Sequence, residues 1–224
     1  MANKKNKQAK AMPLLVIAAV ALVAAVAIVV FGAGQADKAA VGNASAVGII
    51  AGADVEPGTH PTVAIEVANY GTITAELYPE VAPITVENFL KLVDEKFYDG
   101  LTFHRIISGF MIQGGCPLGN GTGGSDENIK GEFSQNGVDN PLNHTRGVLS
   151  MARALNPDSA SSQFFIMHQD APHLDGAYAA FGKVLTGMEV VDAICQNTPV
   201  TDGNGTVSKE NQPVITTIRL IENP

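Results

Sequence analysis

The most informative stretch of this chain is Phe103-His104-Arg105-Ile106-Ile107-Ser108-Gly109-Phe110-Met111-Ile112-Gln113-Gly114-Gly115. It sets one arginine among large apolar side chains and a glutamine, and it closes on two glycines. Further along, Ser162-Gln163-Phe164-Phe165-Ile166 supplies a second glutamine and a second aromatic pair. An apolar socket with one cation at its rim and few other ionisable groups suits a reaction that makes and breaks no covalent bond.

The charge of the chain is unevenly distributed along its 224 residues. Its formal net charge is −8, yet the first ten residues carry four lysines and no acid. The acidic remainder is a poor candidate for binding a phosphate backbone, which requires clustered Lys and Arg. We therefore expect no nucleic-acid partner.

One apolar segment near the start accounts for most of the positive mean hydropathy. Leu14 to Phe31 is uninterrupted by any polar residue, and a helix of that length would cover roughly 27 Å, close to the thickness of a bilayer core. Because the lysines precede it, we expect residues 1–12 to stay cytoplasmic and 13–34 to form a transmembrane signal-anchor. A cleaved signal peptide is the alternative, and Ala44-Ser45-Ala46 would be its small-residue site.

The segment that follows is typical of a tether. Residues 35–60 are mostly Ala, Gly and Val with scattered acids, and as a flexible coil they would span roughly 28 Å. The folded domain is expected over 61–224, on the extracytoplasmic side of the membrane. Export would permit a disulfide between Cys116 and Cys195, but we favour two unpaired thiols, the first in a glycine-rich loop and the second on a helix.

Hydrophobic periodicity predicts a mainly-β domain with two helices. Alternation indicates strands over 62–67, 73–77 and 215–221, and a turn at Asp99-Gly100 precedes one over 101–106. Short apolar runs indicate three more, over 147–152, 163–168 and 181–184. Thr85 is placed to cap a helix with Val86, Phe89, Leu90 and Val93 on its buried face, and 187–197 reads as a second helix with Met188, Val191 and Ile194 inward. Many short strands with two helices favour a closed β-barrel with capping helices.

Six motifs, in order, resemble the cyclophilin-type peptidyl-prolyl cis–trans isomerases. They are Phe103 to Gly115, Gly121-Thr122-Gly123-Gly124, Gly147-x-Leu149-Ser150-Met151-Ala152, Ser162 to Ile166, Leu174-Asp175-Gly176 and Phe181-Gly182-Lys183-Val184. The resemblance covers 62–224 and does not extend to 1–60. It implies a closed eight-stranded antiparallel β-barrel capped by two α-helices, acting as a monomeric domain without cofactor or metal.

The resemblance assigns the catalytic role to Arg105. A twisted X–Pro bond loses conjugation, and its nitrogen gains a usable lone pair, so a donor aimed at that nitrogen stabilises the twisted form more than the planar ones. Arginine is always charged and presents several N–H groups. By the same resemblance, the residues that bind substrate are Phe110, Met111, Phe165 and Leu174 around the proline ring, Gln113 and Gln163 as amides, the backbone of Ala152 and Arg153, and His173 and Tyr178 at the groove edge.

Three of these positions depart from the family's pattern. His173 stands where many members carry tryptophan, Tyr178 where many carry histidine, and Arg153 where an asparagine often follows Met-Ala. The missing indole predicts weak cyclosporin binding with retained activity. Because Arg153 and Tyr178 differ from the family's pattern, the residue that the site prefers before proline is not predicted.

Other polar residues have simpler interpretations. His104 is expected to be a hydrogen-bonded structural histidine rather than a general base. His144, His168 and His173 lack metal-site spacing. The glycines from 114 to 124 lack the Lys-Ser/Thr ending of a phosphate loop.

The favoured function is a membrane-tethered isomerase that acts on proline-containing peptides in unfolded exported proteins. Because unaided isomerisation takes tens of seconds, it can limit folding outside the cytoplasm. The alternative is a non-catalytic module that grips proline segments as a holdase or scaffold at the cell envelope. A third possibility is an envelope adhesin or structural barrel, in which the pocket residues would be coincidental.

Overall fold

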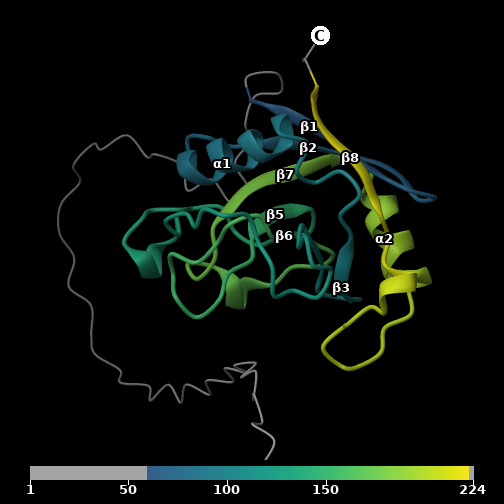
Figure 1. Cartoon of the computed structure of the whole chain (residues 1–224). Helices are drawn as coiled ribbons and strands as arrows, with labels where there is room; N and C mark the ends of the chain where they lie inside the picture. Colours follow the sequence, from purple (N-terminus) through teal and green to yellow (C-terminus); the bar gives the residue numbers. More distant parts are fainter. Residues whose placement is uncertain (1–59, 222–224) are drawn as a thin grey trace, which may run out of the picture. The chain divides into compact units, whose positions relative to one another are not determined.

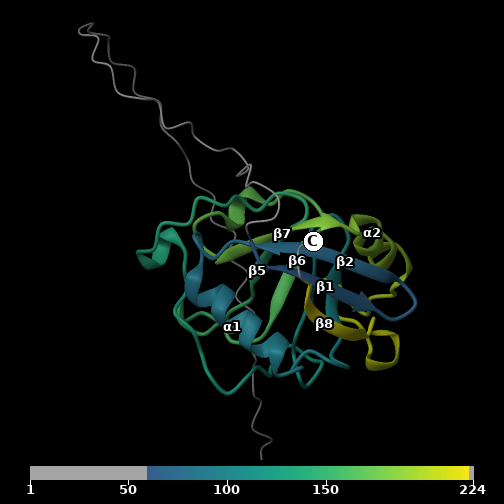
Figure 2. The same cartoon turned by 90° about the horizontal axis from the view of Figure 1, so that it is seen from above.

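The computed structural model describes residues 60–221, in which eight strands form one antiparallel sheet with two helices (Figure 1). The strands are β1 (Thr62–Val67), β2 (Gly71–Leu77), β3 (Phe103–Ile107), β4 (Met111–Gly114), β5 (Val148–Met151), β6 (Phe164–Met167), β7 (Ala180–Thr186) and β8 (Ile215–Ile221). The helices are α1 (Pro83–Asp94) and α2 (Met188–Asn197), which lie on opposite sides of the strands in both views (Figures 1 and 2). The predicted mainly-β class with two helices is confirmed.

The predicted closure of the barrel is wrong. The sheet runs in the order β3-β4-β6-β5-β7-β2-β1-β8, so β3 and β8 are its two edges. The irregular segment 202–213 lies along β3 instead: Ile106 donates its N–H to the Gly205 carbonyl at 2.8 Å, and Phe103 donates to the Pro213 carbonyl at 3.0 Å. Because this segment occupies the edge where β8 would pair, the two edge strands form no ladder and the sheet stays a curled, open half-barrel.

The main core lies on one face of the sheet and is centred on Phe89 of α1. The Phe89 ring lies 5.1 Å from that of Tyr98, 5.2 Å from Phe181 and 5.5 Å from Phe164, and all four side chains are buried. Val86 and Val93 are buried on the same helix face, as predicted, whereas Leu90 is only half-buried. Aromatic groups at these separations add edge-to-face contacts to the burial of apolar area.

The start of α1 differs from the prediction. The helix begins at Pro83, so Thr85 lies within its first turn rather than at the cap. The Glu132 carboxylate, from a distant loop, accepts the N–H of Ile84 at 3.1 Å, the N–H of Thr85 at 2.8 Å and the Thr85 hydroxyl at 2.7 Å. The Glu132 carboxylate therefore satisfies the free N–H groups at the positive end of the helix dipole, which the sequence analysis expected a local cap to do.

Strand β4 was not predicted from the periodicity. Gly109, at φ +82°, turns the chain back after β3, and Phe110 donates its N–H to the Ile107 carbonyl at 2.9 Å. A side chain on Gly114 would come within 2.9 Å of the Phe103 ring, so the glycine lets β4 pair closely beside β3. The strand has four residues, too few for alternation to be visible.

Some expectations fall on residues that the structure does not describe. The cytoplasmic N-terminus (1–12), the signal-anchor (13–34) and all but the last residue of the linker (35–60) lie outside the described part. Within 60–221, no helix has both the length and the apolar character needed to cross a bilayer.

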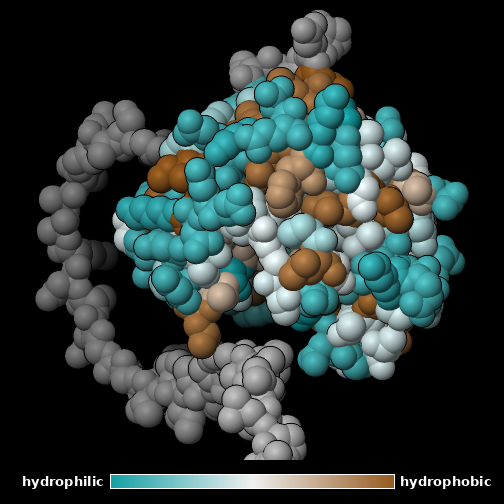
Figure 3. Space-filling view, in the orientation of Figure 1, coloured by the Kyte–Doolittle hydropathy of each residue, from teal (hydrophilic) through white to brown (hydrophobic). Residues whose placement is uncertain are grey.

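Cys116 lies in a loop and Cys195 on α2, and both thiols are free, as predicted. On the face drawn in Figure 3, hydrophilic residues dominate and hydrophobic ones form small separate patches.

Truncating the centre of the core should destabilise the fold strongly. Phe89→Ala is expected to lower the free energy of unfolding by about 3–5 kcal/mol, because it removes apolar contacts and leaves a cavity. Urea unfolding followed by circular dichroism measures this change. Leu90→Ala, on the half-buried side of the same helix, is the matched control and should cost less than half as much; equal losses would show that Phe89 is not the centre of the core.

Candidate active site

The strand register gathers the candidate residues on the sheet face opposite the main core. Arg105 of β3 pairs with Gln113 of β4, and Gln113 pairs with Phe165 of β6. Alternate residues of a strand point to the same face, so Met111 lies on this face too. A smaller apolar cluster covers the face, with Met111, Phe165 and Leu174 buried and Phe110, Ala152 and Tyr178 packed around them.

Arg105 is held by two acceptors at the edge of this cluster. Its Nε donates to the Asn204 carbonyl at 2.8 Å, and its Nη1 donates to Gln113 Oε1 at 3.3 Å. Burial lowers the pKa of the guanidinium, while electrostatic interactions with Tyr178 and Asp202 act in the opposite direction. Because an arginine starts from such a high pKa, it remains charged at neutral pH. The result is a fixed cation beside an apolar surface.

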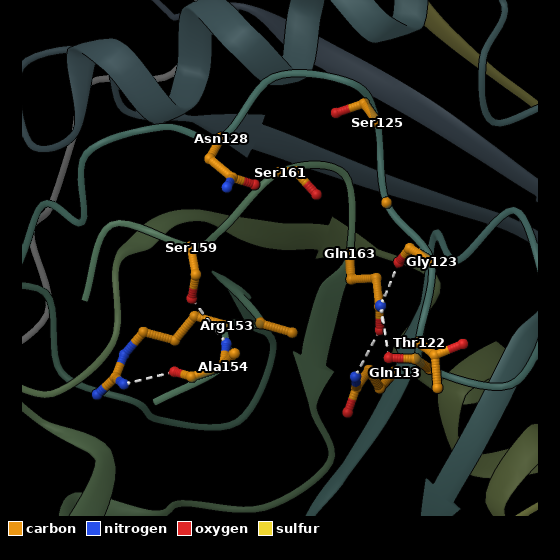
Figure 4. Close-up of a pocket in the computed structure, with 13 residues that line it drawn as sticks. Gln113, Thr122, Gly123, Ser125, Asn128, Arg153, Ala154, Ser159, Ser161 and Gln163 are labelled. Atoms are coloured by element: carbon orange, nitrogen blue, oxygen red, sulfur yellow. Dashed lines mark hydrogen bonds between the residues drawn. The ribbon is translucent and has the colours of Figure 1, made fainter. Parts of the chain in front are cut away.

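A hydrogen-bond chain fixes the orientation of Gln113. Gln113 Nε2 donates to Gln163 Oε1 at 2.9 Å, and Gln163 Nε2 in turn donates to the Gly121 carbonyl at 3.0 Å and to the Gly123 carbonyl at 2.6 Å. Figure 4 shows Gln163 between Gln113 and this glycine-rich loop. The loop carbonyls therefore orient Gln163, Gln163 orients Gln113, and Gln113 presents its oxygen to Arg105.

The expected site residues surround a cavity of about 210 Å³. Its lining is Arg105, Phe110, Met111, Gln113, Ala152, Arg153, Phe165, Leu174 and Tyr178. Two expected residues lie elsewhere: the exposed His173 ring is 5.6 Å from that of Phe110, and Gln163 lines a neighbouring cavity. A hollow that combines the apolar side chains of Phe110, Met111, Phe165 and Leu174 with the guanidinium of Arg105 can seat a five-membered ring and donate to its nitrogen.

The neighbouring cavity, of about 290 Å³, contains residues that the sequence analysis did not single out. It shares Gln113, Ala152 and Arg153 with the first cavity and adds polar groups from the β4–β5 and β5–β6 connections (Figure 4): Thr122, Ser125, Asn128, Ser159 and Ser161. The motif Gly121 to Gly124 was a visible signal for part of this wall. The role of the Asn204 carbonyl could not be predicted from the sequence, because every residue type has a main-chain carbonyl.

The backbone of Ala152 is less available than expected. Its N–H already donates to the Gln163 carbonyl at 2.9 Å. An added peptide strand would therefore have to pair with other main-chain groups along this edge.

The hydrogen bonds expected for His104 are missing. Its side chain is buried, and neither ring nitrogen has a partner at hydrogen-bonding geometry within the described part of the chain. Burial, together with the adjacent charge of Arg105, lowers its pKa to about 4, against a weaker opposing effect of the Thr102 backbone. The ring is therefore neutral at pH 7, and it packs beside Gly121.

A serine, a histidine and an aspartate lie in line beneath Phe165. His144 Nδ1 is 2.9 Å from Asp175 Oδ1, and its Nε2 is 3.0 Å from Ser150 Oγ. Ser150 is fully buried, so no substrate carbonyl can reach it. The His144 ring stacks against Phe165 at 6.1 Å, which makes this group a support for the cavity floor. Across residues 60–221, no three His, Cys, Asp or Glu side chains come together as a metal site would require.

Acid should destabilise the fold through His104. Its pKa is 6.5 in the unfolded chain and about 4 in the fold, so the unfolded state binds the extra proton between these values. The stability present above pH 6.5 should fall by about 3 kcal/mol from this group as the pH drops to 4. Unfolding by urea at pH 4 to 7 measures it. His104→Gln should flatten the profile and exposed His173→Gln should not; identical profiles for all three proteins would contradict the assignment.

The chain is similar to known proteins over the whole of this domain. The family model described as cyclophilin type peptidyl-prolyl cis-trans isomerase/CLD matches residues 62–220. Peptidyl-prolyl cis-trans isomerase B of Bacillus subtilis is 51% identical over 138 residues, which are 62% of this chain and 87% of that protein. A Helicobacter pylori peptidyl-prolyl cis-trans isomerase is 48% identical over 130 residues, 57% of this chain and 77% of that protein.

A solved structure agrees with the fold and with the family. The cyclophilin type isomerase of Cryptosporidium parvum, crystallised in the presence of the dipeptide Ala-Pro, is 34% identical with a TM-score of 0.64. The match covers 72% of this chain and 99% of that one. With an arginine at the wall of an apolar cavity, six motifs in order and a family model that spans the described domain, this chain belongs to the cyclophilin-type peptidyl-prolyl cis–trans isomerases.

Proposed function

We propose that this protein accelerates rotation about X–Pro bonds in exported proteins and so assists their folding outside the cytoplasm. The observation that carries the isomerase activity is the position of Arg105 at the wall of the apolar cavity, held at two points. The proline ring would occupy the hollow among Phe110, Met111, Phe165 and Leu174. No bond to the substrate is made or broken.

The chemistry follows from the amide itself. Conjugation gives the peptide bond a rotation barrier of about 18–20 kcal/mol. When the bond twists, the proline nitrogen pyramidalises and accepts a hydrogen bond that the planar forms cannot accept. A guanidinium already aimed at that point stabilises the twisted state selectively, and removing about 6 kcal/mol would give roughly four decades in rate.

The site of action is the second part of the proposal. The uninterrupted apolar run from Leu14 to Phe31 and the lysines before it support a single-pass anchor with the domain on the extracytoplasmic side. A secreted domain would result if the segment were cleaved near Ala44-Ser45-Ala46. In either case, proline-containing segments of unfolded exported proteins would be the substrates.

Removing the guanidinium should abolish most of the catalysis. Arg105→Ala is expected to lower kcat/KM at least a hundredfold, about 2.7 kcal/mol of transition-state stabilisation, in a coupled proline-peptide assay. Arg105→Lys keeps the charge without the planar fork and should also be impaired. Wild-type turnover by Arg105→Ala would overturn the mechanism, and an intact cellular function in that variant would favour the holdase or scaffold alternative.

Cyclosporin should inhibit this protein weakly. His173 is exposed beside Phe110, where many relatives carry an indole with its donor and flat surface. His173→Trp is expected to lower the inhibition constant at least tenfold, about 1.4 kcal/mol. His173→Phe, which adds a flat ring without a donor, separates the two contributions. Inhibition of the unaltered protein at low nanomolar cyclosporin would contradict the expectation.

A further inference from the structure

The loop between β6 and β7 forms one wall of the proline cavity, through Leu174 and Tyr178. Three successive residues between them are tied to other loops. Asp175 accepts from the backbone N–H of His144 at 2.7 Å, the Gly176 carbonyl accepts from the N–H of Gln135 at 2.9 Å, and the Ala177 carbonyl accepts from Arg153. The first two ties use main-chain donors, and only the third depends on an arginine side chain.

The Arg153 guanidinium makes a dense set of contacts with this loop. Its Nε and Nη2 both donate to the Ala177 carbonyl, at 3.1 and 2.8 Å, and its Nη1 donates to the Ala154 carbonyl at 2.9 Å. The same group lies between two aromatic rings, 4.7 Å from the centre of Tyr178 and 5.0 Å from that of Phe133. The Tyr178 ring also meets the Phe165 ring edge-on, with 5.9 Å between their centres.

The Arg153 side chain does not point toward the two site glutamines (Figure 4). Figure 4 shows the Arg153 side chain running toward Ala154, away from the Gln113–Gln163 pair. Arg153 lines both cavities, and its guanidinium donors are occupied by the Ala177 and Ala154 carbonyls. A planar group with donors in a fixed fork suits this arrangement, and a lysine could supply the charge but not the fork.

We propose that Arg153 is a positioning residue: its guanidinium clamps the Ala177 backbone and the Tyr178 ring, and so fixes the wall of the proline cavity. This inference rests on the proposed isomerase function. Because the clamp acts on the cavity wall and not on Arg105, its loss weakens substrate binding more than it slows the rotation step. Tyr178 is the group through which it acts.

A double-mutant cycle on the full-length protein tests this clamp. Arg153→Gln should raise KM about fivefold with kcat within about twofold, and Arg153→Lys should not restore it. Tyr178→Leu should raise KM similarly, and adding Arg153→Gln to it should change KM by less than about twofold. Arg219→Gln is the matched control, since Arg219 also donates to a carbonyl and pairs with Asp99, outside both cavities. It should leave KM unchanged.

Several outcomes would overturn the inference: a wild-type KM in Arg153→Gln, full rescue by Arg153→Lys, or additive effects with Tyr178→Leu. The dissociation constant for an Ala-Pro peptide, from NMR titration, gives the same cycle without turnover. It therefore keeps the clamp testable if the unaltered protein proves inactive, a result that would overturn only the proposed function. If Arg153→Gln does not fold, Arg153→Lys in the same cycle decides, and binding equal to that of the unaltered protein would refute the clamp.

Discussion

The register of β4 between β3 and β6 is the constraint on which the rest of the site depends. It places Arg105, Gln113 and Phe165 in one row across three strands, all on the face that carries the cavity. Strand side chains alternate with a period of two, so a slip of one residue would turn this row into the main core. The turn at Gly109 and the close approach at Gly114 maintain that register.

The proposed mechanism acts by orientation rather than by reactive groups. Asn204 and Gln113 already align Arg105, so the proposed reaction would require no reorganisation of this side chain. The partly apolar surroundings strengthen its electrostatic effect, because fewer waters compete for its donors. A buried, neutral His104 beside it adds no second charge.

The predictions that succeeded best concern features that short motifs encode through their own residues. Nine of the expected binding and catalytic residues share one cavity, since motifs that pair in adjacent strands bring their residues together. The predictions that failed required knowledge of distant segments. At the start of α1, the Glu132 carboxylate accepts the backbone N–H groups in place of the cap predicted at Thr85. Residues 202–213 lie along the edge where barrel closure was expected. Neither partner is recognisable from local propensity.

The sequence by itself determined the family, the two apolar faces of the strands and the arginine that is proposed to act in catalysis, because residue type and order encode these directly. Only the tertiary structure decided which groups orient that arginine. Main-chain carbonyls of Asn204, Gly121 and Gly123 supply the acceptors, and the side chain of Arg153 donates to the Ala177 carbonyl. Every residue has a main-chain carbonyl, so the direction of a given carbonyl depends on the folded path of the chain and not on the residue type.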